Sequence, residues 1–365
     1  MDKGQKMRKH ITKQIRVGDI LIGGGAPLSI QSMTNTDTRD IKSTVEQIAR
    51  LTDAGCQIVR CAVPNAEAAD AIGQIKKKIR IPLVADIHFD HRLAIDSILN
   101  GADKIRINPG NIGDGEKVNA VLNAAKERGI PVRIGVNSGS LEKHLKKKHG
   151  GVTAKALTES AVEMIKFVEG MDFHELVISL KASDVRLNYE AHLLLIRETN
   201  YPLHIGITEA GTGMPGKIKS AVGIGSLLMA GIGDTLRVSL TGDPVEEIFF
   251  AKELLNIAGI RKGGIDLISC PTCGRTRVDL INLTASVEER LKPYREMWIR
   301  EERKPIKIAV MGCEVNGPGE ASEADMGIAF GKDRAVVFKK GTIIGTYSPK
   351  NGLEILFGLL KEEMG

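Results

Sequence analysis

The sequence predicts an α/β protein with an N-terminal (β/α)8 barrel, the TIM-barrel fold, followed by a smaller α/β domain. Short β-branched runs alternate with amphipathic stretches eight times within residues 27–258. The runs are almost continuously apolar, which is typical of a parallel sheet covered on both faces. Eight such units favour a closed barrel over an open doubly wound sheet, which usually has fewer strands. After residue 258 the alternation stops, and three of the five cysteines follow.

The barrel elements are expected in a regular order. Helices such as STVEQIARLTDAG (43–55) and EKVNAVLNAAKERG (116–129) should lie between the strands, and most end in glycine, a common helix terminator. The segment HITKQIRVGDILIGG (10–24) should form a hairpin that plugs the bottom of the barrel. The eight expected strands are PLSIQSM (27–33), QIVRCAV (57–63), PLVADIH (82–88), KIRINP (104–109), PVRIGVN (131–137), ELVISLKA (175–182), PLHIGIT (202–208) and TLRVSLT (235–241).

The domain boundary is expected between residues 260 and 261, with a substrate-binding barrel over 1–260 and a metal-binding domain over 261–365. RKGGID (261–266) reads as a linker. The second domain should then contain a helix, a strand, a strand pair and a closing helix. These elements are VDLINLTASVEERL (278–291), IKIAVMG (306–312), AVVFKKGTIIGTY (335–347) and LEILFGLLKEE (353–363).

Composition and charge narrow the class of protein. The chain has 365 residues and a formal net charge of +6, which is compatible with a small acidic ligand. The basic run EKHLKKKHGG (142–151) contains no aromatic residue that could stack on a base, so it is read as a solvated face. Signal-peptide and membrane-spanning patterns are missing from the sequence. We therefore expect a soluble, cytoplasmic protein that binds neither nucleic acid nor membranes.

Charged and polar residues gather at the expected C-terminal ends of the strands, where TIM barrels hold their active sites. Arg60 and Arg133 interrupt apolar runs, where an unpaired charge is costly. Convergent guanidinium groups suit phosphate oxygens, so a phosphorylated small ligand is predicted. The strand-end residues also include Asn108 and Arg237. Substrate-binding roles are predicted for Arg60, Asp86, His88, Arg106, Arg133, Asn137, Lys181, Ser183, His204 and Thr208.

Three other features have more than one interpretation. Glu209 is either a structural ion-pair partner or a proton donor. Cys56 and Cys61 bracket an expected buried strand, which favours a packing role. GTGMPG (211–216) matches a dinucleotide-binding pattern but lies in the seventh unit of a barrel, which favours a turn or an anion-binding loop.

The late cysteines predict a metal site. Five cysteines in a cytoplasmic chain argue against a disulfide framework. Cys270, Cys273 and Cys313 could bind structural zinc or an iron–sulfur cluster, and their spacing leaves both open. The sequence has no histidine after His204, so a fourth ligand must come from the barrel or from an oxygen donor, or its position stays open. Glu320, seven residues after Cys313, is the nearest good candidate.

These residues carry a resemblance to a known family. ISCPTCGR (268–275) and MGCEVNGPGEA (311–321) follow a barrel that contains QSMTNTDT, RCAVP, ADIHF, IRINPGN and GITEAG. Together they resemble the bacterial 4-hydroxy-3-methylbut-2-enyl diphosphate synthases of the methylerythritol phosphate route to isoprenoids. The resemblance spans nearly the whole chain, and the cysteine motifs are very specific.

The resemblance implies a [4Fe–4S] cluster held by Cys270, Cys273, Cys313 and Glu320, with a catalytic role for Glu320. The implied substrate is 2-C-methyl-D-erythritol 2,4-cyclodiphosphate. Two electrons and two protons open its ring and release one hydroxyl as water, which yields 4-hydroxy-3-methylbut-2-enyl diphosphate. Flavodoxin or ferredoxin is implied as the electron donor.

The resemblance also implies roles for several residues at the barrel mouth, and it implies an oligomeric state. Glu209 becomes the best candidate for the proton donor. The small domain of one chain is expected to cap the barrel of the other in a homodimer. The residues implied to hold the diphosphate are Arg60, Arg106, Arg133 and Lys181, with Asp86, His88 and Asn137 nearby.

Two other classes of protein remain open. One is a barrel synthase or aldolase for a phosphorylated substrate with a structural zinc module, which would be colourless. The other is a non-enzymatic iron–sulfur scaffold or sensor. The arginine-lined mouth argues against the second, because a scaffold has no need of a diphosphate pocket.

Overall fold

The structure is a computed structural model that describes residues 10–261, 264–301, 303–313, 321 and 323–364. It divides into two compact units, Met1–Ala258 and Gly259–Gly365. In the described residues, no helix combines the length and the apolar composition needed to cross a membrane.

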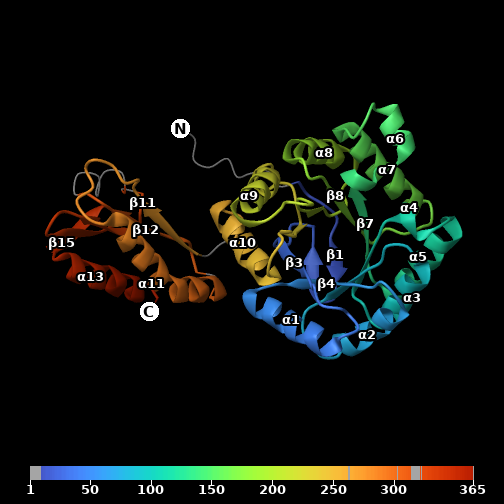
Figure 1. Ribbon diagram of the computed structural model, residues 1–365, viewed down its shortest axis with the longest axis horizontal. Coiled ribbons are helices and arrows are strands. Elements are labelled where there is room, and N and C mark those ends of the chain that lie inside the picture. The colour runs from blue at the N-terminus through green and yellow to red at the C-terminus, as the bar shows by residue number, and fades with distance from the viewer. Residues whose placement is uncertain (1–9, 262–263, 302, 314–320, 322, 365) are drawn as a thin grey trace. The chain divides into compact units, whose positions relative to one another are not determined.

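The first unit is a parallel barrel surrounded by helices (Figure 1). Its strands follow the order β8-β7-β6-β5-β4-β3-β10-β9. The strands are β3 (Ser29–Met33), β4 (Ile58–Ala62), β5 (Leu83–Asp86), β6 (Lys104–Ile107), β7 (Val132–Asn137), β8 (Leu176–Lys181), β9 (His204–Ile205) and β10 (Thr235–Leu236). The helices are α1 (Ile41–Ala54), α2 (Ala66–Lys76), α3 (His91–Leu99), α4 (Pro109–Ile112), α5 (Gly115–Arg128), α6 (Lys143–Lys148), α7 (Ala154–Glu169), α8 (Val185–Glu198), α9 (Gly213–Met229) and α10 (Pro244–Ile257).

The ends of the sheet meet at β8 and β9. One parallel bridge pairs Ile178 with Leu203, and the Ile178 N–H donates to the Pro202 carbonyl at 2.9 Å. The eight-stranded sheet therefore returns on itself and is nearly closed. The (β/α)8 prediction is confirmed, although β9 and β10 are shorter than the expected runs.

The N-terminal hairpin consists of β1 (Ile15–Val17) and β2 (Ile20–Ile22). Its Val17 and Ile22 form one buried apolar cluster with Ile58 and Val84, which lie near the beginnings of β4 and β5. The predicted plug at the N-terminal end of the barrel is therefore confirmed.

Local sequence explains where the barrel helices begin and end. Asp40 and Asp114 precede α1 and α5, and each carboxylate accepts a hydrogen bond from a backbone N–H in the first turn. Gly55 and Gly129 follow the same two helices with left-handed φ angles of 103° and 64°, which favour glycine. These short, defined connections keep the strand ends in fixed positions.

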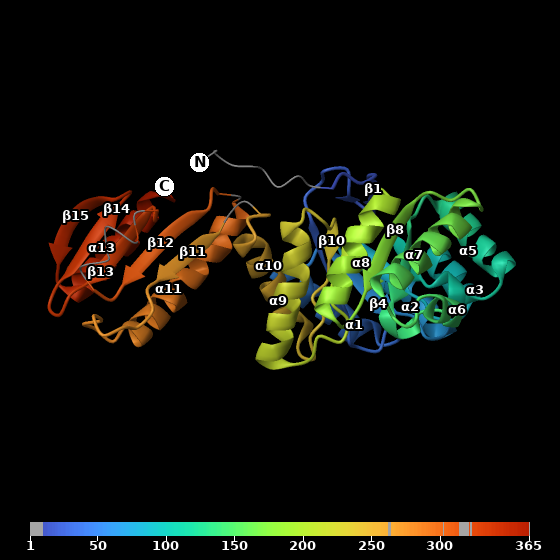
Figure 2. The same cartoon turned by 90° about the horizontal axis from the view of Figure 1, so that it is seen from above.

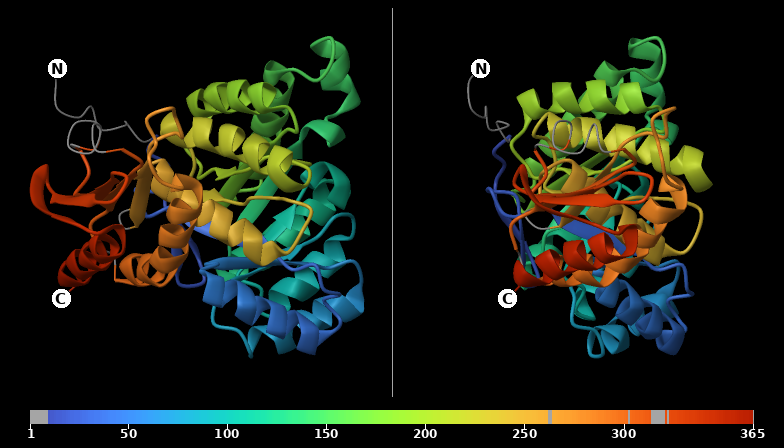
Figure 3. Two further views of the ribbon diagram at one scale, coloured as in Figure 1. Left: turned by 60° about the vertical axis from the view of Figure 1, so that its left-hand side comes forward. Right: turned by 90° about the vertical axis from the view of Figure 1, so that its left-hand side faces the viewer.

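The second unit is a five-stranded mixed sheet with two helices on one side (Figure 2, Figure 3). Strands β11, β12 and β13 are parallel, and β14 and β15 continue the sheet in antiparallel fashion. Side chains of both helices pack with the sheet in one apolar core. The elements are β11 (Ile265–Ser269), α11 (Leu280–Arg300), β12 (Ile306–Met311), β13 (Met326–Phe330), β14 (Ala335–Lys339), β15 (Thr342–Tyr347) and α13 (Pro349–Glu362).

The sequence reading of this unit was incomplete. It assigned Ile265 and Asp266 to a linker, but both belong to β11. It also missed β13, and it ended the long helix near residue 291 although α11 continues to Arg300. The two overlooked strands are important because they complete the parallel part of the sheet that carries the cysteines.

Candidate active site

The barrel interior is unusually polar, and strand alternation explains why. Side chains two residues apart on a strand point to the same face. On β6 this places Lys104 and Arg106 together inside the barrel, with Asn108 next in the series. Lys104 is completely buried and Arg106 is 8% exposed. The alternation in KIRIN (104–108) could have predicted that Lys104 lies inside the barrel with Arg106, but Lys104 was missing from the predicted site residues.

Asp86, the last residue of β5, is the centre of an ion-pair cluster. Its carboxylate lies 3.2 Å from Arg106 Nη1, 3.7 Å from Arg60 Nε and 3.7 Å from His88 Nε2. Burial alone would raise the pKa of this carboxyl, but the nearby cations and the His88 hydrogen bond hold the pKa of Asp86 well below its usual range. Four predicted residues are therefore brought together around one negative charge.

Three interior cations have no carboxylate within ion-pair distance among the residues that the structure describes. The structure records no ion pair for Lys104, Arg133 or Lys181 within the described residues. Arg133 Nη1 donates to Gln31 Oε1 at 3.4 Å, whereas Arg133 Nε and Lys104 Nζ have no hydrogen-bond partner. Burial lowers the pKa of all three cations well below their ordinary values, and neighbouring cations lower it further. The interior therefore contains more positive than negative charge.

Two glycines make room for two of these cations. A Cβ on Gly135 would lie 2.8 Å from Arg106 Nη2, and a Cβ on Gly206 would lie 2.8 Å from Lys181 Nζ. Real Cβ atoms essentially never come this close to another atom, so a side chain at either position would require the cation to move. The head groups of Arg106 and Lys181 thus lie directly against the backbone of Gly135 in β7 and of Gly206, the residue that follows β9.

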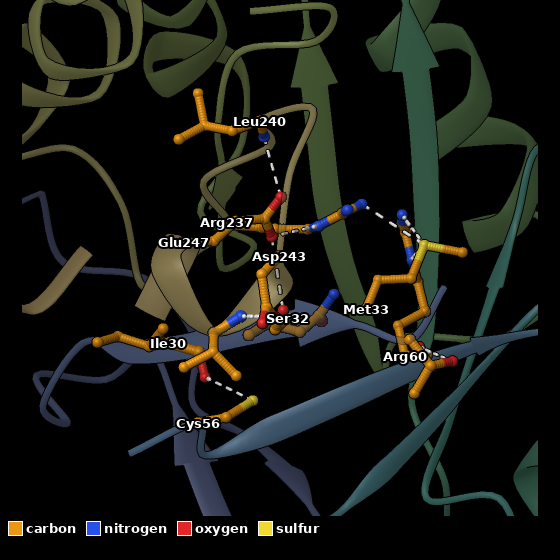
Figure 4. A network of polar contacts seen from close by, with 12 residues as sticks. Ile30, Ser32, Met33, Cys56, Arg60, Arg237, Leu240, Asp243 and Glu247 are labelled. Carbon is orange, nitrogen blue, oxygen red and sulfur yellow. Dashed lines mark hydrogen bonds and ion pairs between the residues drawn. The ribbon is translucent and has the colours of Figure 1, made fainter. Parts of the chain in front are cut away.

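A second polar network holds Arg237, the residue that follows β10, in place (Figure 4). Met33 Sδ accepts from Arg60 Nη2 at 2.8 Å and from Arg237 Nη1 at 3.5 Å. The buried Glu247 of α10 lies 3.8 Å from Arg237 Nε and accepts from the Leu240 N–H at 2.9 Å. Burial raises the pKa of Glu247, although Arg237 opposes the shift. Sequence reasoning missed Glu247 because it reaches the mouth from a helix and not from a strand end.

The remaining predicted residues are distributed differently. Asn137 ends β7 and pairs in register with Lys181 on β8, so both lie at the mouth. His204 was expected at a strand end, but it begins β9 and is completely buried, with Nδ1 3.4 Å from Thr235 Oγ1. Asn108 caps α4 through the Gly110 N–H. Ser183 lines a separate cleft between α8 and α9.

The segment after β9 contains the last two predicted mouth residues. The Thr208 N–H donates to the Ala182 carbonyl at 3.4 Å, which ties this segment to the end of β8. Glu209 is exposed and has a left-handed φ of 53°, a strained conformation for a residue other than glycine. Such strain is common at functional sites.

Cys56 and Cys61 lie in the barrel core. Both are buried, and burial raises the pKa of their thiols to about 12 and about 11, respectively. Cys56 Sγ donates to the Ile58 carbonyl at 3.1 Å. The predicted packing role of these two residues is confirmed.

The late cysteines share one edge of the second unit. Cys270 directly follows β11, and Cys313 follows β12 by two residues. Because β11 and β12 are parallel, their carboxyl ends meet at the same edge. The Gly312 N–H donates to Cys270 Sγ at 3.3 Å, and the Cys273 N–H donates to Thr276 Oγ1 at 3.1 Å.

This donor set fits an iron–sulfur cluster in its chemistry. Thiolate ligands and backbone N–H groups directed at sulfur are both features of protein-bound clusters. Within the described residues, however, no three His, Cys, Asp or Glu side chains are gathered closely enough to hold a metal ion. Glu320, the predicted fourth ligand, lies outside the described residues.

Fold and site together define a class of protein: a (β/α)8 barrel with a cation-rich interior, followed by a small α/β unit with three cysteines in the segments after β11 and β12. Residues 12–252 match the GcpE TIM-barrel domain, and residues 266–362 match the GcpE protein C-terminal domain. The chain belongs to the GcpE family, which confirms the resemblance seen in the motifs.

Two relatives support this family assignment over nearly the full length of the chain. The 4-hydroxy-3-methylbut-2-en-1-yl diphosphate synthase (flavodoxin) of Caldanaerobacter subterraneus is 56% identical over 98% of this chain and 97% of its own. The protein of the same name from Clostridium perfringens is 57% identical over 97% of this chain and 99% of its own. Among solved structures, Yersinia pestis dihydropteroate synthase matches 67% of this chain and 98% of its own with a TM-score of 0.47 and 14% identity, a similarity too low to add to the assignment.

Proposed function

We propose that this chain catalyses the two-electron reductive ring opening of 2-C-methyl-D-erythritol 2,4-cyclodiphosphate to 4-hydroxy-3-methylbut-2-enyl diphosphate. Full-length relatives at more than half identity carry the corresponding enzyme name. The structural observation that supports it is the surplus of positive charge in the barrel. Two carboxylates, Asp86 and Glu247, accompany six interior cations, which are Arg60, Lys104, Arg106, Arg133, Lys181 and Arg237.

A cyclic diphosphate supplies the charge that this interior lacks. Guanidinium groups bind phosphate oxygens with paired, directional hydrogen bonds, and a buried site strengthens each of them. In our proposal Arg60, Arg106, Arg133 and Lys181 hold the two phosphates. Asp86 keeps Arg60 and Arg106 oriented, and Asn137 and His88 border the same mouth.

Glu209 is the proposed proton donor. Its side chain is exposed, and it lies four residues after the end of β9. Its backbone has a strained left-handed φ, which the surrounding chain must stabilise. Thr208, the residue before it, is tied to the end of β8 next to Lys181. A carboxyl at this position would deliver a proton to the hydroxyl that leaves as water.

Cys270, Cys273, Cys313 and Glu320 would hold a [4Fe–4S] cluster in the second unit. When bound, the cluster supplies electrons and a Lewis-acidic iron. The three thiols and the barrel cations belong to different units, so the reaction requires the two units to come together.

The proposal includes partners and location. Flavodoxin, which the relatives' names include, would donate the electrons, and a homodimer would let the second unit of one chain cap the barrel of its partner. Reduced thiols and cluster chemistry suit a cytoplasmic location.

Anaerobic purification tests the cluster. We expect broad absorption near roughly 400 nm and about four iron and four sulfide ions per chain. Cys270→Ser, Cys273→Ser and Cys313→Ser should each lose iron and activity, whereas Cys56→Ala and Cys61→Ala should retain both. A colourless protein that contains one zinc ion would contradict the proposal and favour a barrel synthase with a zinc module.

Glu320→Cys tests the fourth ligand. Cysteine binds iron tightly, so the cluster should assemble, but the displaceable oxygen ligand would be gone. We expect unchanged iron content, strongly reduced turnover and no substrate-induced change in the electron paramagnetic resonance spectrum of the reduced protein. Normal turnover in Glu320→Cys would remove Glu320 from the ligand set and leave the three cysteines in place.

A further inference from the structure

The second unit carries a basic surface beside Cys313. A pocket of about 460 Å³ opens there, and it is lined by Arg275, Arg277, Cys313, Gly331, Lys332, Asp333 and Arg334. We call its four cations, Arg275, Arg277, Lys332 and Arg334, the basic rim. All four are exposed. Of the described residues in this lining, one, Asp333, is acidic.

The sheet topology brings the basic rim to the cysteine edge. Strands β11, β12 and β13 are parallel, so the turn that follows β13 lies at the same edge as Cys270 and Cys313. This turn carries Lys332 and Arg334. On the other side of the pocket, Arg275 and Arg277 belong to the loop that begins at Cys270.

Backbone hydrogen bonds hold both parts of the basic rim in place. The Gly331 N–H donates to the Arg334 carbonyl at 2.7 Å, which closes the turn between β13 and β14. The Arg277 N–H donates to the Gly312 carbonyl at 3.0 Å, which ties the cysteine loop to the end of β12. A surface that is ordered before binding loses less entropy when a partner docks.

We propose that the basic rim is the docking surface for the electron donor, an acidic flavodoxin. Complementary charge steers such partners and orients them without a large apolar interface. Weak electron-transfer complexes typically use small contact areas. The rim surrounds a pocket that contains Cys313, so a protein docked there would lie next to the proposed cluster ligand. The identity of the donor rests on the proposed function.

The substrate's diphosphate is the alternative occupant, and two observations disfavour it. The barrel interior already supplies six cations, three of them without an ion-pair partner among the described residues. The rim cations are exposed, and exposed charges are screened by salt, which suits a transient protein partner more than tight capture of a small anion.

A charge-reversal experiment tests this surface in the cluster-loaded protein. The variant is Arg277→Glu/Lys332→Glu, and Lys332→Glu alone is used if the double variant has a reduced iron content. The matched control, Lys143→Glu/Lys147→Glu, makes the same change in net charge on exposed residues of α6. Binding of recombinant bacterial flavodoxin is measured by calorimetry at several salt concentrations. Turnover is measured with flavodoxin and, separately, with dithionite.

We expect flavodoxin affinity to fall at least about tenfold in the rim variant and its salt dependence to weaken. Dithionite-driven turnover and substrate affinity should be unchanged, and the control should behave like wild type. Loss of substrate affinity, or an equal loss of turnover with both reductants, would overturn the proposal in favour of substrate binding. Unchanged flavodoxin affinity would also overturn it. Failure of the wild type to convert the cyclic diphosphate with dithionite would instead contradict the proposed function, since flavodoxin binding is measured independently.

Discussion

Lys104 shows at the scale of one residue how the barrel interior departs from ordinary core packing. A completely buried lysine normally has a carboxylate or several hydrogen-bond acceptors beside it. Lys104 Nζ has no hydrogen-bond partner in the described structure, and Arg133 and Arg60 lower its pKa further after burial. Such an arrangement opposes folding, and it makes sense where a bound anion later offsets the charge.

We predict that Lys104→Met stabilises the barrel. An unsatisfied buried donor costs about 1–3 kcal/mol, so the free energy of unfolding should rise by about that amount at pH 7. The folded-state pKa of Lys104 is lowered, so the wild type takes up a proton on unfolding and loses stability as pH falls from about 10.4 toward that lowered pKa. The advantage of Lys104→Met should therefore be smaller at pH 10 than at pH 7. Urea denaturation at both pH values measures the difference in the free energy of unfolding between the variant and the wild type. A variant less stable than the wild type at pH 7 would show that the Lys104 side chain has stabilising partners in the fold.

The five cysteines should differ in reactivity. In cluster-free protein at pH 8, iodoacetamide should modify the exposed Cys273 rapidly and leave Cys56 and Cys61 unmodified. Burial excludes the reagent from both, and their pKa values of about 12 and about 11 leave almost no thiolate at this pH. Mass spectrometry over time measures the order of labelling, with urea-unfolded protein as the control in which all five react. Labelling of Cys61 as fast as Cys273 in the folded protein would contradict its place in the core.

Sequence predicted the positions of the candidate site residues wherever one strand was enough to place them. Arg60, Asp86, Arg106 and Lys181 could be identified because a charge at a strand end has one destination in a barrel. Glu247 could not, because its role depends on how α10 packs against β3 and on the hydrogen bond from the Leu240 N–H. His204 was misplaced because the run PLHIGIT forms a two-residue strand that begins at His204.

At the scale of elements, the strands of the barrel contribute their backbone as well as their side chains. Gly135 lies in the middle of β7, where a glycine usually weakens a strand. Its missing Cβ is the space that the Arg106 guanidinium occupies, because a methyl group on the Gly135 Cα would lie 2.8 Å from Nη2 and 2.9 Å from Nε. We infer that Gly135 positions Arg106 for its proposed contact with the substrate's phosphate.

Gly135→Ala should therefore weaken substrate binding by about tenfold, because about 1.4 kcal/mol corresponds to a tenfold change in affinity. Calorimetry with the cyclic diphosphate measures the effect. Gly225→Ala on α9, where a Cβ would meet its nearest atom, Leu254 Cδ1, at an ordinary 3.7 Å, is the control and should bind normally.

A double-mutant cycle separates positioning from general destabilisation. Lysine has a narrower head group than arginine, so Arg106→Lys combined with Gly135→Ala should bind better than the sum of the single changes predicts. Additive losses would indicate that Gly135 does not act through Arg106.

The second unit shows the limit of reading elements from a sequence. IDLIS (265–269) and MGIAF (326–330) are each five residues long. A cysteine-containing loop follows the first, and a turn follows the second. A five-residue segment is too short for its periodicity to distinguish a strand from a loop or a helix fragment. Their identity as strands is decided by pairing with β12, which is a long-range contact. The barrel strands are just as short, but they could be recognised because strand and helix patterns alternate eight times along residues 27–258.

At the scale of the whole molecule, the chemistry is divided between two units. The cations that would hold the diphosphate lie within Met1–Ala258, and the three candidate cluster thiols lie within Gly259–Gly365. In the proposed reaction, neither unit alone would contain a complete site. If the active site forms between chains of a dimer, a defect in one unit can be compensated by the intact unit of another chain; if it forms within one chain, it cannot.

Complementation distinguishes these two cases. Arg133→Met removes a diphosphate cation and Cys313→Ser removes a thiol, so each variant should be inactive alone. The two variants are unfolded, mixed in equal amounts and refolded, and the cluster is then assembled anaerobically. About half of the dimers should contain one chain of each variant. One of the two sites in each such dimer would combine an intact barrel with an intact second unit. Turnover should then recover to about a quarter of that of wild-type protein treated identically. The same variants refolded separately and mixed afterwards are the control. No recovery in refolded mixtures that contain cluster and form mixed dimers would place the complete site within a single chain and contradict the proposed capping between subunits.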